Sequence, residues 1–121
     1  MSAFVTVKNH TFECEINRSR FIGICCRVRD DDAATRALTD IRKTYRDCTH
    51  VCYAYSTVDG ARSSDDGEPS GTAGVPIAEC IRSAGVKEVL VAVVRYFGGI
   101  KLGTGGLLRA YTAAASGVIA G

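Results

Sequence analysis

The sequence lacks several features that would place it in a specialised class of proteins. It has no tryptophan and two prolines in 121 residues. Its longest apolar run, residues 89–94, is far shorter than the roughly 18 residues that cross a membrane. Residues 1–8 show no basic segment followed by an apolar stretch and a cleavage site, so no secretory signal is indicated. These absences predict a cytoplasmic protein without a membrane segment.

The sequence also lacks a large excess of charge of either sign. Fifteen basic against thirteen acidic residues leave a net charge of +2, too little for sequence-independent attraction to nucleic acid over the whole surface. Any nucleic-acid contact must therefore be a local basic patch.

Cysteine is plentiful, but its spacing does not suggest a disulfide scaffold. The six cysteines are scattered, and no signal peptide accompanies them, so we expect reduced thiols. Hydrophobic residues make up 46% of the chain and charged residues 23%, which is enough apolar surface for one packed core. The sequence therefore predicts one globular domain spanning residues 1–121.

Hydrophobic periodicity predicts an α+β fold with the element order βββαβαβα. The expected strands are residues 3–8, 12–16, 20–28, 49–58 and 88–97. Helices are expected over residues 30–46, after three aspartates suited to capping, over residues 76–85, and from Leu107 onward. The strand at 88–97 is apolar on both faces, which is typical of a central strand covered on two sides.

Residues 59–75 have almost no apolar content and are expected to form a long loop, a common place for function. Asp65, Asp66 and Glu68 lie close together in it. Carboxylates at this density hold Mg²⁺ or act as general bases, but they also form turns and helix caps, and both interpretations stay open.

A glycine-rich segment follows the last strand. Gly103, Gly105 and Gly106 precede a helix, and Lys101 and Arg109 flank them. Free backbone N–H groups and the helix dipole favour an anion there, and the spacing matches neither a P-loop nor a dinucleotide fingerprint. The alternative is that the glycines only permit close packing.

Cys48, His50 and Cys52 alternate along one expected strand. They could begin a zinc site, although no fourth ligand is evident, and a Cys–His nucleophile pair lacks a third orienting group. His50 is therefore interpreted as a pocket-wall residue, with no metal and no cofactor expected.

Four segments resemble the signature segments of the IMPACT/YigZ family. They are SRF at 19–21, THVCYAY at 49–55, residues 64–74, and RYFGGIKLGTGGLLRAY at 95–111. The resemblance implies the N-terminal IMPACT domain of a bacterial member, with a ferredoxin-like C-terminal domain absent from this chain. It also implies a two-layer α+β sandwich like the second domain of small-subunit ribosomal protein five. Eukaryotic members of the family regulate translation.

The sequence as a whole predicts a binding module of translation or its stress regulation, which contacts RNA, the ribosome or a regulatory protein. Its anion or nucleic-acid site is predicted to comprise Arg95, Lys101, Gly103, Gly105, Gly106 and Arg109. The cleft wall is predicted to comprise His50, Asp65, Asp66, Glu68, Thr72 and Tyr96. The alternative is a Mg²⁺-dependent enzyme acting on a phosphorylated small molecule, and a third possibility is that both motifs only build the fold.

Overall fold

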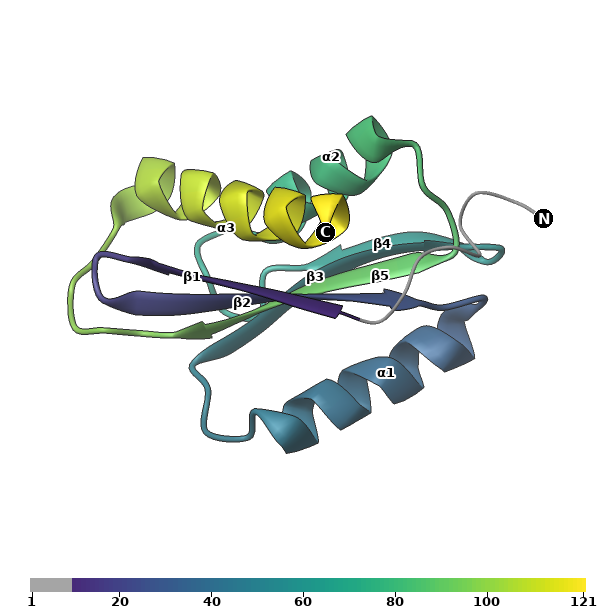
Figure 1. Ribbon diagram of the computed structural model, residues 1–121, viewed down its shortest axis with the longest axis horizontal. Helices are drawn as coiled ribbons and strands as arrows, with labels where there is room; N and C mark the ends of the chain where they lie inside the picture. Colours follow the sequence, from purple (N-terminus) through teal and green to yellow (C-terminus); the bar gives the residue numbers. More distant parts are fainter. Residues whose placement is uncertain (1–9) are drawn as a thin grey trace.

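The computed structural model describes residues 10–121, which form one antiparallel five-stranded sheet with three helices (Figure 1). In chain order the elements are β1 (His10–Ile16), β2 (Ser19–Arg27), α1 (Asp31–Thr44), β3 (His50–Thr57), β4 (Gly60–Ser64), α2 (Gly74–Ala84), β5 (Val89–Tyr96) and α3 (Gly103–Ala120). The strand order across the sheet is β1-β2-β5-β3-β4. The predicted α+β class is confirmed.

Strand β5 lies at the centre of the sheet between β2 and β3, as its two apolar faces predicted. Val89 to Arg95 are all buried. Val89, Val91 and Val93 pack with α2 and α3. Leu90, Ala92 and Val94 point to the other face of the sheet and pack with α1. A strand of this kind needs a covering layer on each side.

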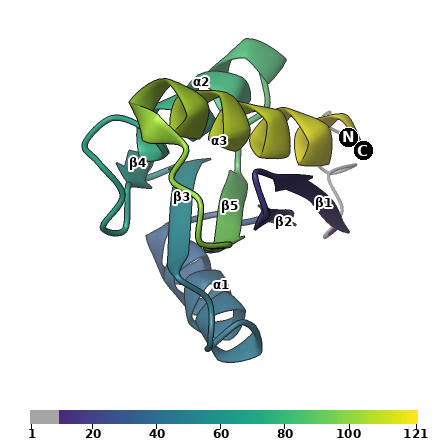
Figure 2. The same cartoon turned by 90° about the vertical axis from the view of Figure 1, so that its left-hand side faces the viewer.

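The helices supply those two layers (Figure 2). Helix α1 begins after Asp30, whose side chain accepts a hydrogen bond from Ala33 N at 2.9 Å, and it packs Leu38 and Ile41 on one face of the sheet. Helices α2 and α3 cover the other face. The structure therefore has three layers, namely α1, the sheet, and α2 with α3, where two were expected, because both faces of β5 are apolar.

Two element boundaries also differ from the expectation, and the strand expected at 3–8 lies outside the described residues. Strand β4 occupies part of the expected loop 59–75. Its five residues have little apolar character because it is an exposed edge strand. Helix α3 begins at Gly103, before the expected Leu107. Its first turn faces solvent and therefore carries no hydrophobic pattern that would mark the start of the helix. No helix within residues 10–121 is long and apolar enough to cross a membrane.

Candidate functional site

Three connections meet at the end of the sheet where β5 finishes, which we call the loop end. They are the β1–β2 turn, the α1–β3 connection and the glycine loop of residues 97–102 (Figure 1). A side chain at position 98 would place its Cβ 2.1 Å from Arg18 O, so only glycine fits against the β1–β2 turn. Phe97 N donates a hydrogen bond to Thr49 Oγ1 at 2.9 Å, which ties the glycine loop to the α1–β3 connection.

The predicted anion-binding glycines lie together at the N-terminus of α3. Gly103 has φ +72°, a left-handed conformation that favours glycine. Leu102 at the N-cap makes no side-chain cap hydrogen bond, and the first turn contains no acidic residue. The first N–H groups of such a helix have no partner within the helix and favour an anion. Lys101 and Arg109 are exposed beside them.

Arg95 was predicted to belong to the anion or nucleic-acid site, but its side chain lies inside the protein. Its side chain is 5% exposed, and Nη1 donates to Glu68 Oε1 at 3.1 Å and to Oε2 at 2.8 Å. Nε and Nη2 donate to Ser19 Oγ at 3.3 and 3.2 Å. The guanidinium lies 5.5 Å from the ring centroid of Phe21 and 5.3 Å from that of Phe97. Arg95 is therefore an internal partner of Glu68.

Glu68 is the centre of a buried polar cluster. Its Oε2 accepts the Tyr111 hydroxyl at 2.5 Å, and its Oε1 lies 3.4 Å from His50 Nε2. Tyr111 OH in turn accepts a hydrogen bond from Cys52 Sγ at 3.4 Å. These contacts join the loop after β4 to β3, β5 and α3.

Burial sets the ionisation of two members of this cluster. It is the main cause of a raised pKa for the Tyr111 hydroxyl, and it raises the pKa of the Cys52 thiol to about 12. The thiol of Cys52 therefore stays protonated near neutral pH, which argues against a Cys52–His50 nucleophile pair because the thiolate is the reactive form.

Asp65 organises the loop that carries it. Its Oδ2 accepts Gly71 N at 2.9 Å, and its Oδ1 accepts Ala73 N at 3.1 Å and Gly74 N at 2.8 Å. Burial acts to raise the pKa of this carboxyl, but the three N–H donors outweigh it, so the pKa lies below its ordinary value. Asp65 thus connects the loop to the start of α2.

The other loop residues are also engaged with the protein. Asp66 Oδ2 accepts Val51 N at 2.7 Å, and Asp66 O lies 2.8 Å from His50 Nδ1. The hydroxyl of Thr72, which is buried, donates to Pro69 O at 2.5 Å. Of the predicted wall residues, His50, Asp66 and Glu68 are therefore brought together, and the two carboxylates contact groups of the protein.

The motifs considered for metal binding do not converge. Among residues 10–121, no three His, Cys, Asp or Glu side chains gather in an arrangement that would hold a metal ion. Cys52 packs between the sheet and α2/α3, whereas Cys48 packs on the α1 side.

The predicted wall residue Tyr96 lies apart from the buried cluster. Its hydroxyl donates to Asp47 Oδ1 at 3.1 Å, and Arg20 lies above its ring.

Ser19, Phe97 and Tyr111 were missed as site residues by reasoning from the sequence. All three lie within or beside the motif segments that suggested the family, and Ser19 also accepts a hydrogen bond from Gly98 N at 3.3 Å. Their motif membership was the available signal, but only the fold shows that Ser19 and Phe97 contact Arg95 and that Tyr111 contacts Glu68.

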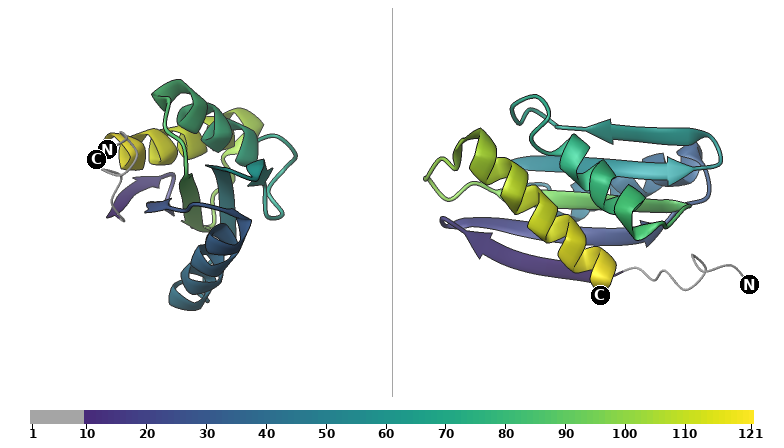
Figure 3. Two further views of the ribbon diagram at one scale, coloured as in Figure 1. Left: turned by 90° about the vertical axis from the view of Figure 1, so that its right-hand side faces the viewer. Right: turned by 90° about the horizontal axis from the view of Figure 1, so that it is seen from above.

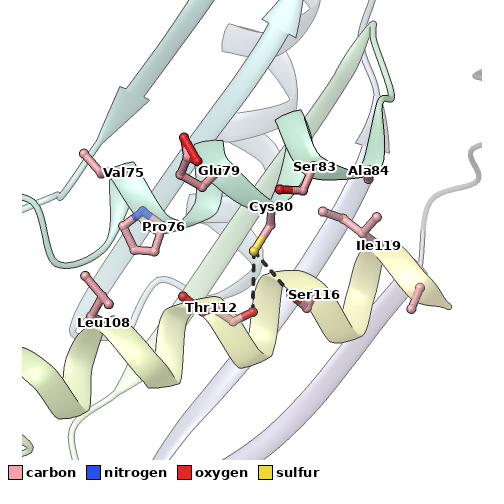
Figure 4. Close-up of a pocket in the computed structure, with 11 residues that line it drawn as sticks. Val75, Pro76, Glu79, Cys80, Ser83, Ala84, Leu108, Thr112, Ser116 and Ile119 are labelled. Atoms are coloured by element: carbon pink, nitrogen blue, oxygen red, sulfur yellow. Dashed lines mark hydrogen bonds between the residues drawn. The ribbon is translucent and has the colours of Figure 1, made fainter.

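A separate groove of about 690 Å³ lies between α2 and α3 (Figure 4). Val75, Leu108 and Ile119 line it, and Cys80 Sγ lies 3.3 Å from Ser116 Oγ near its middle. This groove is lined by none of the residues predicted from the sequence.

Comparisons with known proteins agree with the family resemblance. The family described as the Impact N-terminal domain matches residues 17–119. IMPACT family member YvyE of Bacillus subtilis is 43% identical over 115 residues, covering 92% of this chain and 53% of its own length. IMPACT family member YigZ of Escherichia coli is 43% identical over 104 residues, covering 80% and 50%. The chain thus spans about half the length of these relatives.

Solved structures show the same fold. A crystal structure of a hypothetical protein is 37% identical with a TM-score of 0.89, and the match covers 93% of this chain and 57% of that one. The two-domain translational regulator Yih1 is 23% identical with a TM-score of 0.51, covering 99% and 48%. The likeness to Yih1 is one of fold.

Proposed function

We propose that this chain, which belongs to the Impact N-terminal domain family, is a cytoplasmic binding module of translation regulation that contacts RNA through its loop end. The description of Yih1 as a translational regulator supports a role in translation regulation. Because a shared fold does not define a function, the choice of RNA depends on the surface of this chain.

The loop end gathers exposed basic side chains from separate parts of the sequence. Arg18 comes from the β1–β2 turn, Arg46 from the α1–β3 connection, and Lys101 and Arg109 from the glycine loop and α3. Within residues 10–121, no salt bridge involves any of these four side chains. Such a local basic patch suits phosphates despite the small net charge.

The observation that carries the proposal is the inward pairing of Glu68 with Arg95 while Lys101 and Arg109 stay exposed. The Glu68 carboxylate is thereby neutralised by Arg95 inside the protein. Phe97, which is 47% exposed, adds an aromatic face on which an unpaired base can stack. The N–H groups at the start of α3 provide a position for one phosphate.

Fluorescence anisotropy with single-stranded RNA of about 12 nucleotides tests this at about 50 mM and about 200 mM salt. We expect affinity to fall steeply with salt. The Lys101→Ala/Arg109→Ala variant should bind at least about tenfold more weakly, with a salt slope reduced by about one per charge removed. Arg29→Ala/Arg36→Ala is the matched control, because it removes the same charge from exposed positions at the opposite end of the sheet.

Three outcomes would overturn the proposal. They are no RNA binding at either salt concentration, binding that does not depend on salt, and equal weakening by both double variants. A second domain is expected in the longer relatives, so the proposal concerns what this domain contributes to the whole protein.

A further inference from the structure

Strand β4 forms an open edge of the sheet at a distance from the loop end (Figure 3, right). Thr57 pairs with Gly60 across the two-residue turn, and Tyr55 pairs with Arg62. Because hydrogen-bonded pairs alternate in an antiparallel hairpin, the N–H and C=O groups of Ala61 and Ser63 point away from β3. No strand pairs with this edge within residues 10–121.

A cavity of about 430 Å³, which we call the edge groove, lies directly beside these free groups. Strand β4 and helix α2 form its two sides. Ala54 and Ile81 belong to the apolar core beneath it, and Ala61 and Ser63 share the face of the sheet on which Ala54 lies. A side chain from a strand added to β4 opposite Ala61 or Ser63 would therefore project over the groove.

The charges around the edge groove are unevenly placed. Gly74, at the start of α2, packs against the Ser64 backbone, so the helix runs from the Ser64 end of β4 toward the Ala61 end. Ser56 pairs with both Ala61 and Val89, which brings Lys87 to the Ala61 end as well. Arg82 and Lys87 line the groove there.

One acid, Glu79, accompanies these bases, and it is already paired with Arg82 at 2.5 Å. The rim therefore keeps an excess of positive charge from Lys87. We propose that the β4 edge and the edge groove bind an extended peptide with an apolar side chain followed two residues later by an acidic one, added antiparallel to β4.

The order of the two side chains follows from the geometry. An antiparallel strand passes Ser63 before Ala61, so its first inward side chain enters the groove and its second lies beside Arg82 and Lys87. Backbone pairing with Ala61 and Ser63 supplies affinity, and the two side chains supply selectivity.

A second copy of the chain fits the edge less well than an acidic peptide. If β4 paired antiparallel with β4 of a second copy about a two-fold axis, the pairing that uses both free residues would set Ala61 opposite Ser63 of the copy. This register sets Arg62 opposite its own counterpart, and like charges directly opposite are destabilising. The charge of the rim likewise favours a partner of opposite sign.

Selection from a random-peptide phage library on the 121-residue chain tests the proposal, followed by amide hydrogen exchange with the selected peptide. We expect enrichment of the apolar–x–acidic spacing and slowed exchange at Ala61 and Ser63. N-methylation of the peptide at the residues that pair with Ala61 and Ser63 should weaken binding about tenfold, whereas methylation of the residue between them should have no effect.

Protein variants give an independent readout. Ala61→Pro removes an outward N–H without removing a bond to β3, so the domain should fold and lose the peptide. Arg82→Gln/Lys87→Gln should weaken peptides with the acid more than peptides with Gln in its place, and Arg29→Gln/Arg36→Gln should not. No enriched spacing, unchanged exchange at Ala61 and Ser63, or concentration-dependent dimers through β4 would overturn the proposal.

Discussion

Replacing Glu68 by glutamine is the sharpest perturbation of the buried cluster. The Glu68 and Arg95 side chains are 4% and 5% exposed, and Arg95 Nη1 contacts both carboxylate oxygens. Removing one partner of a buried ion pair leaves the other charge uncompensated and typically costs about 3–5 kcal/mol. Because glutamine keeps one carbonyl acceptor, we expect a loss near the lower limit, about 3 kcal/mol.

That loss corresponds to a fall in Tm of roughly 12 °C for a domain of this size. Urea unfolding monitored by circular dichroism measures the change in free energy. Glu79→Gln is the matched control: it breaks a second Arg–Glu pair that lies on the surface, where the Arg82 side chain is 76% and the Glu79 side chain 54% exposed, so its midpoint should stay near that of the parent.

A double replacement separates the lost charge from lost packing. Arg95→Met combined with Glu68→Leu removes both charges, so it should cost far less than the sum of the two single replacements. An unchanged midpoint for Glu68→Gln, or additive losses in the double variant, would refute the assignment of this pair as the connection between the loop and β5.

Three further predictions concern other parts of the domain. The folded pKa of Asp65 lies below its unfolded value near 3.8, so the ionised carboxylate stabilises the protein above that pH, and this contribution is lost as the pH falls through the folded pKa. The difference in unfolding free energy between the parent and Asp65→Asn should therefore shrink below about pH 4. A difference that does not change with pH would contradict this prediction. Burial raises the pKa of Cys25 to about 11 and that of Cys52 to about 12, so iodoacetamide at pH 8 should label both only after unfolding, as mass spectrometry of the digested protein would show. Gly98→Ala should destabilise the domain strongly because its Cβ would meet Arg18 O. Gly105→Ala should be neutral or stabilising by up to about 1 kcal/mol, since its Cβ meets only the end of the Arg109 side chain at 3.4 Å. Equal thermal shifts for the two variants would refute this prediction.

The central strand and the amphipathic helix were predictable because their signals are local. Continuous burial of β5 and the helical spacing of Ala34, Leu38 and Ile41 follow directly from side-chain type. Strand β4 was not predictable in this way. Its residues carry almost no hydrophobic pattern, and it is a strand because β3 offers a free edge and a two-residue turn lies between them.

The motifs identified where the important residues lie, but not how they are used. Arg95 and Glu68 were both expected at a cleft, one as a phosphate contact and one as a wall. Each is instead the main charged partner of the other, 27 positions apart in sequence. A sequence places charges along a line, whereas burial and distance decide whether opposite charges neutralise each other or stay available to a ligand.

The family, the α+β class, the central strand and the glycine-rich segment before the last helix could all be predicted from the sequence, because each depends on local pattern or on motif spacing. Only the folded structure shows which helices cover each face of the sheet, that the acidic loop is held by its own carboxylates, and that Lys101 and Arg109 remain exposed while Arg95 does not. These properties depend on which distant segments meet, because contact in three dimensions sets the burial and pairing of every charged group.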